Sequence, residues 1–242
     1  MYFKLSGDPY LNFVEDIVYH SRSCNYVDCS SCCIKLEPVY QFKYLGLQLD
    51  VNLNWKGHYQ SLKQQLNSTL RAMYLLRPLC PATVLHNFYH ACVGSRLGYG
   101  LPCWGGVYKS TLEPLCIQQK YIIRVMFFKR RWESSWPIFQ AGKLLPLQHL
   151  YIFKVLKLFF SKSGHRLLRL IPVYNIRNNH RSLFSVPVFN TEAFRKYYLV
   201  SAPTFFNRLP LHLRLQFSNK NFINLIKEWL FENRDIGFMF AR

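Results

Sequence analysis

Residues 55–77 read WKGHYQSLKQQLNSTLRAMYLLR, and this stretch decides the fold. Its apolar residues recur at the three- and four-residue spacing of one helix face, namely Leu62, Leu66, Leu70 and Met73. Basic side chains such as Lys63 occupy the remaining surface. The stretch therefore predicts an amphipathic helix, and we expect the chain to be mostly helical from Trp55 onward.

The fifty or so residues before this helix have strand character. Asn12 to His20 is one expected strand. Tyr40 to Asp50 is the clearer one, because its Leu45, Leu47 and Leu49 alternate onto one face, as the two-residue period of a strand requires. Residues 21–31 between them are polar and rich in cysteine, which is typical of a hairpin tip or a small loop module.

Further helices are expected after the first one. Pro78 and Pro81 end it, and Pro81 suits the first turn of a second helix that runs toward Tyr99. Ser110 and Glu113 have the spacing of a capping box that opens a third helix. Apolar periodicity predicts a helix over residues 147–160 and a last one that carries Phe222, Leu225, Ile226 and Trp229.

The predicted fold class is α+β and mostly α-helical. A small N-terminal antiparallel β-hairpin or sheet precedes a helical bundle and a helical C-terminal region. We expect three regions: a β-rich segment over residues 1–50, a helical domain over residues 51–131, and a basic helical region over residues 132–242.

The charge of the chain points to a polyanionic partner. Lys and Arg total 31 against 12 Asp and Glu, so the net charge is +19. Such a field attracts polyanions, of which nucleic acid is the obvious one. Aromatic residues make up 17 % of the chain, which excludes a disordered basic tail because such tails lack large apolar groups. The composition indicates a folded basic protein.

Eight cysteines without an even spacing indicate free thiols in a reducing compartment, and no secretory signal pattern opens the chain. We therefore expect an intracellular protein, nuclear or cytoplasmic and not secreted. The most apolar stretch, residues 144–160, carries Gln148, His149, Lys154 and Lys157, so no transmembrane segment is expected.

The acidic residues argue against catalysis by this chain. Polymerases and nucleases hold divalent cations with clustered carboxylates, whereas the adjacent pair here is Glu15 and Asp16. Neighbouring side chains on a strand point to opposite faces, so that pair is a poor metal site. Neither a phosphate-binding loop nor a nucleophile elbow is found in the sequence. No catalytic residue is predicted.

Two groups of side chains have metal-ligand chemistry. His86 and His90 are four apart on an expected helix, but Asn87 replaces the glutamate of the zinc-protease motif, so core or interface histidines are the simpler interpretation. The second group lies upstream and consists of the soft ligands Cys24, Cys29, Cys32 and Cys33, with His20 nearby in the sequence. Because structural zinc sites usually pair two short ligand turns, free thiols in a loop are favoured over zinc. No cofactor is expected in this chain.

Basic residues supply the positive signal. They recur along the helices and among aromatics that we expect to be exposed, such as Tyr59, Tyr74 and Tyr121, a mixture that neutralises phosphates and stacks on bases. The candidate nucleic-acid-binding residues are Lys56, Lys63, Arg71, Arg77, Lys120, Arg124, Lys129, Arg130, Arg131 and Arg177. Any one of them has a solvated helix face as its simpler interpretation, but the whole set favours polyanion binding.

The chain carries several short motifs, and both the motifs and their order resemble those of the reverse transcriptases of non-LTR retrotransposons. These are LINE-type elements of the jockey-like and related groups. The similar segments are Phe42 to Asp50, Leu53 to His58, Leu97 to Gly100 with Trp104 and Gly105, Leu115 to Lys120 with Ile123 and Arg124, Tyr174 to Arg177, and Phe206 to Pro210. Ile176 replaces the threonine of the family's Tyr-Asn-Thr-Arg element. The resemblance spans nearly the whole chain.

This resemblance implies a thumb over residues 55–128 that holds a template-primer duplex through its backbone, followed by a C-terminal region that contacts RNA or target DNA. Phosphate contacts would then come from Lys63, Arg71, Lys120 and Arg124. The family's catalytic Asp pair, its Mg²⁺ and its endonuclease map onto no residue here. The resemblance thus predicts a truncated RNA-directed DNA polymerase that binds RNA and DNA without polymerase activity, missing the palm and endonuclease. The alternative is a helical protein-interaction module derived from such an element. Binding to a membrane surface is the weakest alternative, because the charges are spread over the whole chain.

Overall fold

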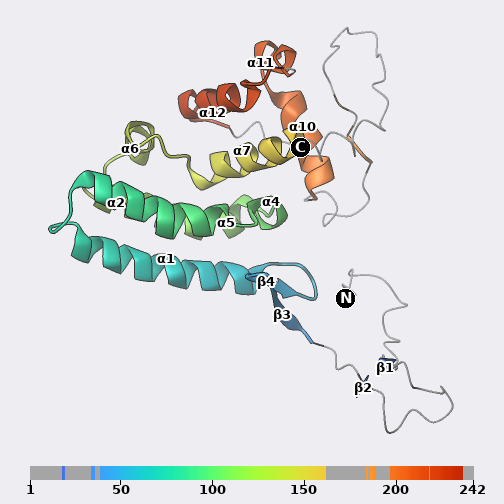
Figure 1. Ribbon diagram of the computed structural model, residues 1–242, viewed down its shortest axis with the longest axis horizontal. Coiled ribbons are helices and arrows are strands. Elements are labelled where there is room, and N and C mark those ends of the chain that lie inside the picture. The colour runs from blue at the N-terminus through green and yellow to red at the C-terminus, as the bar shows by residue number, and fades with distance from the viewer. Residues whose placement is uncertain are drawn as a thin grey trace. The chain divides into compact units, whose positions relative to one another are not determined.

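The computed structural model describes residues 18–19, 34–35, 39–161, 184, 186–188, 197–217 and 219–236. These residues are mostly α-helical, and two short antiparallel strand pairs lie on the N-terminal side (Figure 1). The predicted α+β, mostly helical class is therefore confirmed. The chain forms two compact units, residues 1–60 and residues 61–242. The division into three regions at residues 50 and 131 stays a prediction.

Strand pairs in the first unit are short. β1 (Val18–Tyr19) pairs antiparallel with β2 (Ile34–Lys35). The rest of the strand expected over residues 12–20 lies outside the described residues, as does the cysteine-rich segment between these two strands.

The segment from Tyr40 to Asp50 is a hairpin and not the single strand that its alternating leucines predicted. β3 (Gln41–Tyr44) pairs antiparallel with β4 (Leu47–Asp50), and Tyr44 lies opposite Leu47. The two-residue loop is Leu45 and Gly46, both with positive φ, 46° and 83°. Positive φ at both loop positions is the geometry of a type I′ turn, whose twist matches that of the paired strands. A turn thus interrupts the alternation, and Leu45 is exposed.

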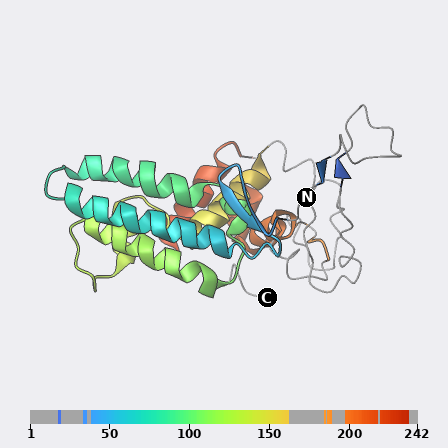
Figure 2. The same cartoon turned by 90° about the horizontal axis from the view of Figure 1, so that it is seen from below.

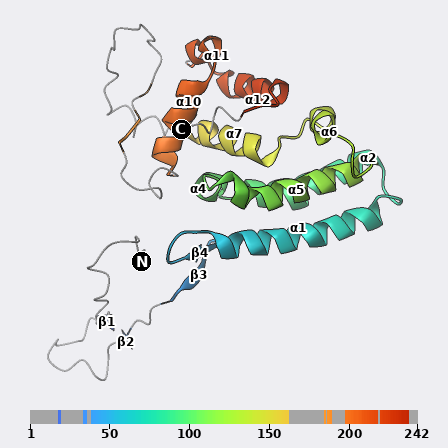
Figure 3. The same cartoon turned by 180° about the vertical axis from the view of Figure 1, so that it is seen from behind.

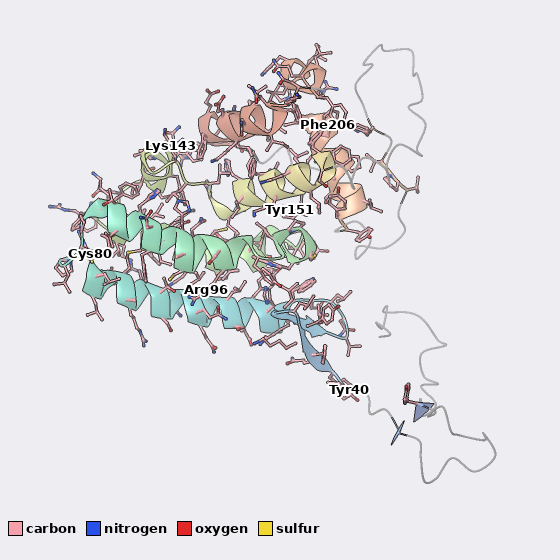
Figure 4. The ribbon with its side chains drawn as sticks, in the orientation of Figure 1. Tyr40, Cys80, Arg96, Lys143, Tyr151 and Phe206 are labelled. Atoms are coloured by element: carbon pink, nitrogen blue, oxygen red, sulfur yellow. The ribbon has the colours of Figure 1, made fainter. Side chains whose placement is uncertain are left out.

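The first long helix forms where the sequence predicts it. α1 (Lys56–Leu76) buries Leu62, Leu66 and Met73, whereas Leu70 is half-buried. Its middle part is tied to a later helix by a guanidinium group. Arg96 donates from Nη1 to Thr69 Oγ1 at 2.8 Å, and Thr69 Oγ1 donates to the carbonyl of Gln65 at 2.9 Å. Figure 4 shows Arg96 between α1 and the next layer of helices.

The second helical run is interrupted by a wider turn. It consists of α2 (Ala82–Tyr89), the π-helical turn η2 (His90–Gly94) and α3 (Ser95–Gly98), and the short helix α4 (Leu101–Trp104) follows. Pro81 precedes α2 as its N-cap residue, whereas a place in the first turn was expected.

Two glycines fix the chain around α4. Gly100 has a φ of 58°, which a residue without Cβ adopts at low cost. At Gly105 an added Cβ would lie 2.4 Å from Tyr151 Cδ2, so only glycine lets the backbone approach that ring. Trp104 donates from Nε1 to the Tyr99 carbonyl at 2.8 Å. In the segment from Leu97 to Gly105, these contacts explain in structural terms why Gly100, Trp104 and Gly105 occupy their positions.

The third long helix is α5 (Lys109–Met126). It begins at Lys109, after Tyr108, and no side-chain cap bond is seen there among the described residues, so the predicted capping box of Ser110 and Glu113 is wrong. α1, α2 and α5 run side by side within residues 61–126 (Figure 2). α6 (Ser135–Ala141) and α7 (Leu147–Phe160) follow, and α7 has the predicted bounds.

A buried glutamine joins three of these helices. Gln119 donates from Nε2 to Tyr89 Oη at 2.9 Å and to the Leu145 carbonyl at 3.1 Å. Its Oε1 accepts from the Leu147 amide at 2.9 Å. Because every polar atom of this side chain is bonded, it links α5 to α2 and to the start of α7 without the cost of an unpaired buried group. Burial raises the pKa of Tyr89 to about 12.

The last helices are α10 (Tyr198–Arg208), α11 (Leu211–Leu215) and α12 (Phe222–Glu232). α10 and α12 pack on α7, which lies between them and the layer of α4 and α5 (Figure 3), and α11 contacts α12. The predicted last helix is confirmed. α10 was not predicted.

A phenylalanine cluster fills the space between these helices, near the labelled Phe206 in Figure 4. Ring centroids lie 4.4 to 6.4 Å apart in pairs that join α7, α10 and the start of α12. The cluster consists of Phe159, Phe160, Phe184, Phe206, Phe217 and Phe222. Asn207 fastens Phe184 to it, donating to the Phe184 carbonyl at 2.7 Å and accepting from its amide at 2.8 Å.

Within the part of the chain that the structure describes, no helix is both long enough and apolar enough to cross a membrane.

Candidate nucleic-acid interface

The turn that follows α5 is fixed by its own backbone. The amide of Phe128 donates to the Val125 carbonyl at 3.2 Å, and the amide of Lys129 donates to the Arg124 carbonyl at 2.8 Å. This pair of bonds is a Schellman motif, in which the residue at the position of Phe128 is usually glycine. Phe128 has a φ of 58° there. The helix therefore ends in a tight turn that presents an aromatic side chain, 53 % exposed, at a strained position.

Arginines around this turn lie against aromatic rings. The Arg77 guanidinium is 4.4 Å from the centroid of Phe128, and that of Arg130 is 5.5 Å from Trp132. Such contacts are attractive because the ring face carries negative electrostatic potential. A guanidinium over a ring uses its flat face, so its in-plane N–H groups can still reach a phosphate.

Tyr121 on α5 gathers two further arginines. Arg131 lies 5.2 Å from the Tyr121 ring and donates from Nη2 to its hydroxyl at 3.2 Å, and Arg124 lies 6.0 Å from the same ring. The pKa of Arg131 is raised, chiefly by the hydrogen bond to Tyr121 and to a smaller extent by Tyr74 of α1. The end of α1 and the end of α5 therefore belong to one surface.

Glu133 organises the turn. Its carboxylate accepts from the Arg130 amide at 2.7 Å and lies 3.5 Å from Lys129 Nζ. Its backbone carbonyl accepts from Arg124 Nε at 2.9 Å. The bond from the Arg130 amide, helped by the attraction of Lys129, lowers the pKa of Glu133. Glu133 thus remains ionised at neutral pH and offsets only part of the local positive charge.

We call this region the basic–aromatic surface. It consists of Tyr74, Arg77, Tyr121, Arg124, Phe128, Lys129, Arg130, Arg131 and Trp132. In Figure 2 it is the end of the helix layer where the chain leaves α5 beside the α1–α2 connection. Tyr74 and residues 128–132 are exposed, whereas Arg77, Tyr121 and Arg124 are half-buried. The exposed cations and rings can neutralise phosphates and stack on bases.

The other predicted binding residues are more dispersed. Lys63 and Arg71 are exposed on α1 and Lys120 is exposed on α5. Lys56 is exposed at the start of α1, within the unit of residues 1–60. Arg177 lies outside the described residues. Ring contacts, hydrogen bonds and an ion pair thus join Arg77, Arg124, Lys129, Arg130 and Arg131 to the basic–aromatic surface. Lys120 lies one helix turn before Arg124 on α5, and Arg71 one turn before Tyr74 on α1.

Two of the expected aromatics have other surroundings and two important ones were missed. Tyr59 is buried, so its expected exposure is wrong, and Tyr121 is half-buried, whereas Tyr74 is exposed. Phe128 and Trp132 were not singled out. Their signal in the sequence is residues 127–132, FFKRRW, in which three cations in a row are flanked by aromatic residues on both sides.

Metal-ligand chemistry is not assembled in the part of the chain that the structure describes, where no group of three or more histidine, cysteine or acidic side chains gathers. The rings of His86 and His90 are 4.7 Å apart, and His86 Nε2 bonds to the Gly142 carbonyl at 3.0 Å. Cys80, Cys92 and Cys103 are free thiols. The Cys24, Cys29, Cys32 and Cys33 group and the pair of Glu15 and Asp16 lie outside the described residues.

Comparison with known proteins gives no match: no family model, no curated protein and no solved structure is similar to this chain.

Proposed function

We propose that this protein binds RNA and DNA without regard to sequence, through the basic–aromatic surface. The observation that carries the proposal is the set of arginine–ring contacts at the end of α5. There Arg77, Arg130 and Arg131 lie against aromatic rings, and the Glu133 carboxylate interacts with Lys129 and Arg130. Their positive charge is therefore held in place and only partly neutralised. A phosphate backbone is the ligand that matches fixed, outward-facing guanidinium groups.

The net charge of the whole chain supports the same class of ligand. With +19 overall, encounter with a polyanion is favoured, and in this proposal the basic–aromatic surface is where it is held. Contacts to phosphates alone carry no sequence information, so the expected binding is general.

We further propose that the chain corresponds to the thumb and C-terminal region of a non-LTR retrotransposon reverse transcriptase. The support is the order of its short motifs, from Phe42 to Pro210. The described motif residues have definite structural roles here, as Gly100, Gly105, Gln119 and Asn207 illustrate. Such roles explain these residues by folding alone, so the resemblance itself remains the support for this second proposal. In this proposal the parent enzyme's Mg²⁺ chemistry belongs to other residues, and this chain alone synthesises no DNA.

Binding is tested by titration of labelled single-stranded and duplex RNA and DNA at several salt concentrations. On duplex DNA the logarithm of the affinity should fall linearly with the logarithm of salt, with a slope of about −0.9 per neutralised phosphate. Affinity that does not change between low and physiological salt contradicts the proposal. A primer-extension assay with Mg²⁺ tests the second half, because robust synthesis by this chain would overturn it.

One observation favours the alternative of a protein-interaction module. Tyr40, Phe42 and Tyr44 are exposed along one side of β3, and the Phe42 and Tyr44 rings are 6.5 Å apart. Aromatic residues are enriched at protein–protein interfaces. A protein complex that survives high salt, in a chain that does not retain nucleic acid, would support this alternative.

A further inference from the structure

Trp132 is the most exposed ring of the basic–aromatic surface, with 78 % of its surface accessible. Tryptophan is usually buried to a large extent, because its ring contributes much apolar area. Here it follows directly on Lys129, Arg130 and Arg131 and lies on a turn that is closed by defined bonds. A large ring that is held in water by a fixed backbone needs an explanation other than packing.

The bonds that close the turn do not involve the Trp132 ring. They run between the backbone of Lys129 and that of Arg124, from Arg124 Nε to the Glu133 carbonyl, and from the Arg130 amide to the Glu133 carboxylate. The turn therefore keeps its shape whatever the ring contacts. Pre-organisation of this kind lowers the ordering cost of a ligand that lies against the ring.

One face of the Trp132 ring is occupied by an arginine. Arg130 lies over the ring at 5.5 Å from its centroid. With 78 % of the residue accessible, the second face of the indole is open to a flat partner. Phe128, on the same turn, presents its ring beside Arg77 in a comparable way. The turn thus presents open ring faces, and the cations of residues 129–131 lie directly between the two rings in the sequence.

We propose that residues 127–133 form a stacking platform for an unpaired base, so that the preferred ligand of the basic–aromatic surface is single-stranded RNA or DNA. The base lies against the open face of Trp132, and the flanking phosphates are contacted by Lys129 and Arg131. This inference rests on the proposed nucleic-acid binding and adds the class of nucleic acid. Bases inside a duplex are stacked on each other, so only an unpaired base offers a free face to the indole.

The test separates the base from the phosphates. Fluorescence anisotropy is measured with a labelled single strand of about 12 nucleotides, within the range of sites known for single-strand binding. An otherwise identical strand in which the bases are removed has the same phosphates. We expect the wild-type chain to bind the base-containing strand about tenfold more tightly than the abasic one. RNA and DNA should both show the difference, because the base stacks and the sugar does not.

Substitutions at Trp132 test whether the preference for base-containing strands comes from its ring. Trp132→Ala should bind both strands equally, at the affinity that the wild type has for the abasic strand, whereas Trp132→Phe should keep most of the preference. Leu215→Ala is the matched control, because Leu215 is 68 % exposed on α11, and it should behave as the wild type. Because Trp132 is exposed, its replacement should leave the thermal unfolding midpoint unchanged.

Two results would overturn the stacking platform while nucleic-acid binding stands. One is equal wild-type affinity for the base-containing and abasic strands. The other is a Trp132→Ala variant that keeps the wild-type preference for bases. A chain that binds neither strand nor a blunt duplex at low salt contradicts the proposed function itself.

Discussion

Two groups of aromatic side chains in residues 61–242 have the same ring chemistry and opposite surroundings. In the phenylalanine cluster, Phe159, Phe206 and Phe222 are each 2 % exposed or less and contact one another. In the basic–aromatic surface, Phe128 and Trp132 are more than half exposed and contact arginines. Rings that meet rings stabilise the fold, whereas rings that meet cations in water are available to a ligand.

This difference shows what aromatic content can and cannot indicate. The chain has 17 % aromatic residues, which predicts a folded protein. The same number does not say which rings fill the core. Whether a ring is buried depends on the residues around it. Apolar positions of α7, α10 and α12 surround the phenylalanine cluster, whereas the cations of residues 129–131 lie around the rings of the basic–aromatic surface.

Truncation of a ring in the phenylalanine cluster should have the largest effect on stability. Phe206→Ala leaves a cavity between α7, α10 and α12, and large-to-small changes of this kind cost about 3–5 kcal/mol. Urea unfolding followed by circular dichroism measures the loss. Phe128→Ala, which removes the same atoms from an exposed turn, should cost far less. Equal losses at both positions would contradict the distinction between the two groups.

Loss of the Asn207 clamp should have the next largest effect. Asn207→Ala removes both bonds to the Phe184 backbone. Those backbone groups are part-buried, so leaving them unpaired should lower the free energy of unfolding by about 1–3 kcal/mol. Thr204→Ser, a change on the same helix that keeps the hydroxyl which donates to the Val200 carbonyl, serves as the control in the same unfolding experiment. A neutral Asn207→Ala variant would mean that Phe184 is held by ring packing alone.

Glycine substitution at two helix ends should sharpen the comparison. Lys143 closes α6 as Phe128 closes α5, with a φ of 50° and bonds from its own amide to Gln140 and from Leu144 to Phe139. Lys143→Gly should stabilise the protein by about 0.5–1 kcal/mol, because glycine adopts this conformation without a Cβ clash.

Phe128→Gly removes the same strain but also the contact with Arg77, which is worth about 0.5–1 kcal/mol at an exposed site. We therefore expect a smaller gain from Phe128→Gly than from Lys143→Gly, together with weaker nucleic-acid binding. Thermal unfolding and anisotropy, measured on the same preparations, give the two quantities. A larger gain at Phe128 would show that its ring contributes nothing through Arg77.

Mild acid should have a small effect on the core. Burial lowers the pKa of His149, which bonds through Nε2 to the Asn233 carbonyl at 3.0 Å. The unfolded chain then binds the proton more readily than the folded chain, so stability falls as the pH drops through and below about 6.5. Between pH 7.5 and 6.0 this histidine contributes at most about 0.8 kcal/mol of that loss. His149→Gln, whose amide can donate to the same carbonyl, should show a smaller pH dependence in urea unfolding, and an unchanged dependence would contradict the assignment.

The long helices were predictable because their cause is local. α1 and α7 follow from the spacing of apolar residues, and their bounds agree with the prediction closely. The hairpin at Tyr40 to Asp50 was not predictable from alternation, because Leu45 continues the pattern through the turn itself. The usual Asn-Gly signal of such a turn is replaced by Leu45 and Gly46. α10 was missed because Pro203 interrupts the pattern that marks a helix interior.

The site was only half predictable. The sequence identified Lys129, Arg130 and Arg131 by their charge, but it did not identify the contacts of this surface. Tyr121 is ten positions from Arg131, and Arg77 is fifty-one positions from Phe128. Long-range contacts of this kind depend on how α1 and α5 pack. The exposure of Phe128 and Trp132 depends on the turn geometry, which the letters FFKRRW do not state.

The most direct measurement compares two triple variants that remove the same charge from different surfaces. One carries Lys129→Gln, Arg130→Gln and Arg131→Gln. The other carries Lys157→Gln, Lys220→Gln and Arg234→Gln, at exposed positions of α7 and of residues 219–236. The account predicts that the first variant loses duplex affinity and has a salt slope smaller by up to about 0.9 for each phosphate contact removed, while the second stays near the wild type. Equal losses in both variants would contradict it, because binding would then follow net charge and not the basic–aromatic surface.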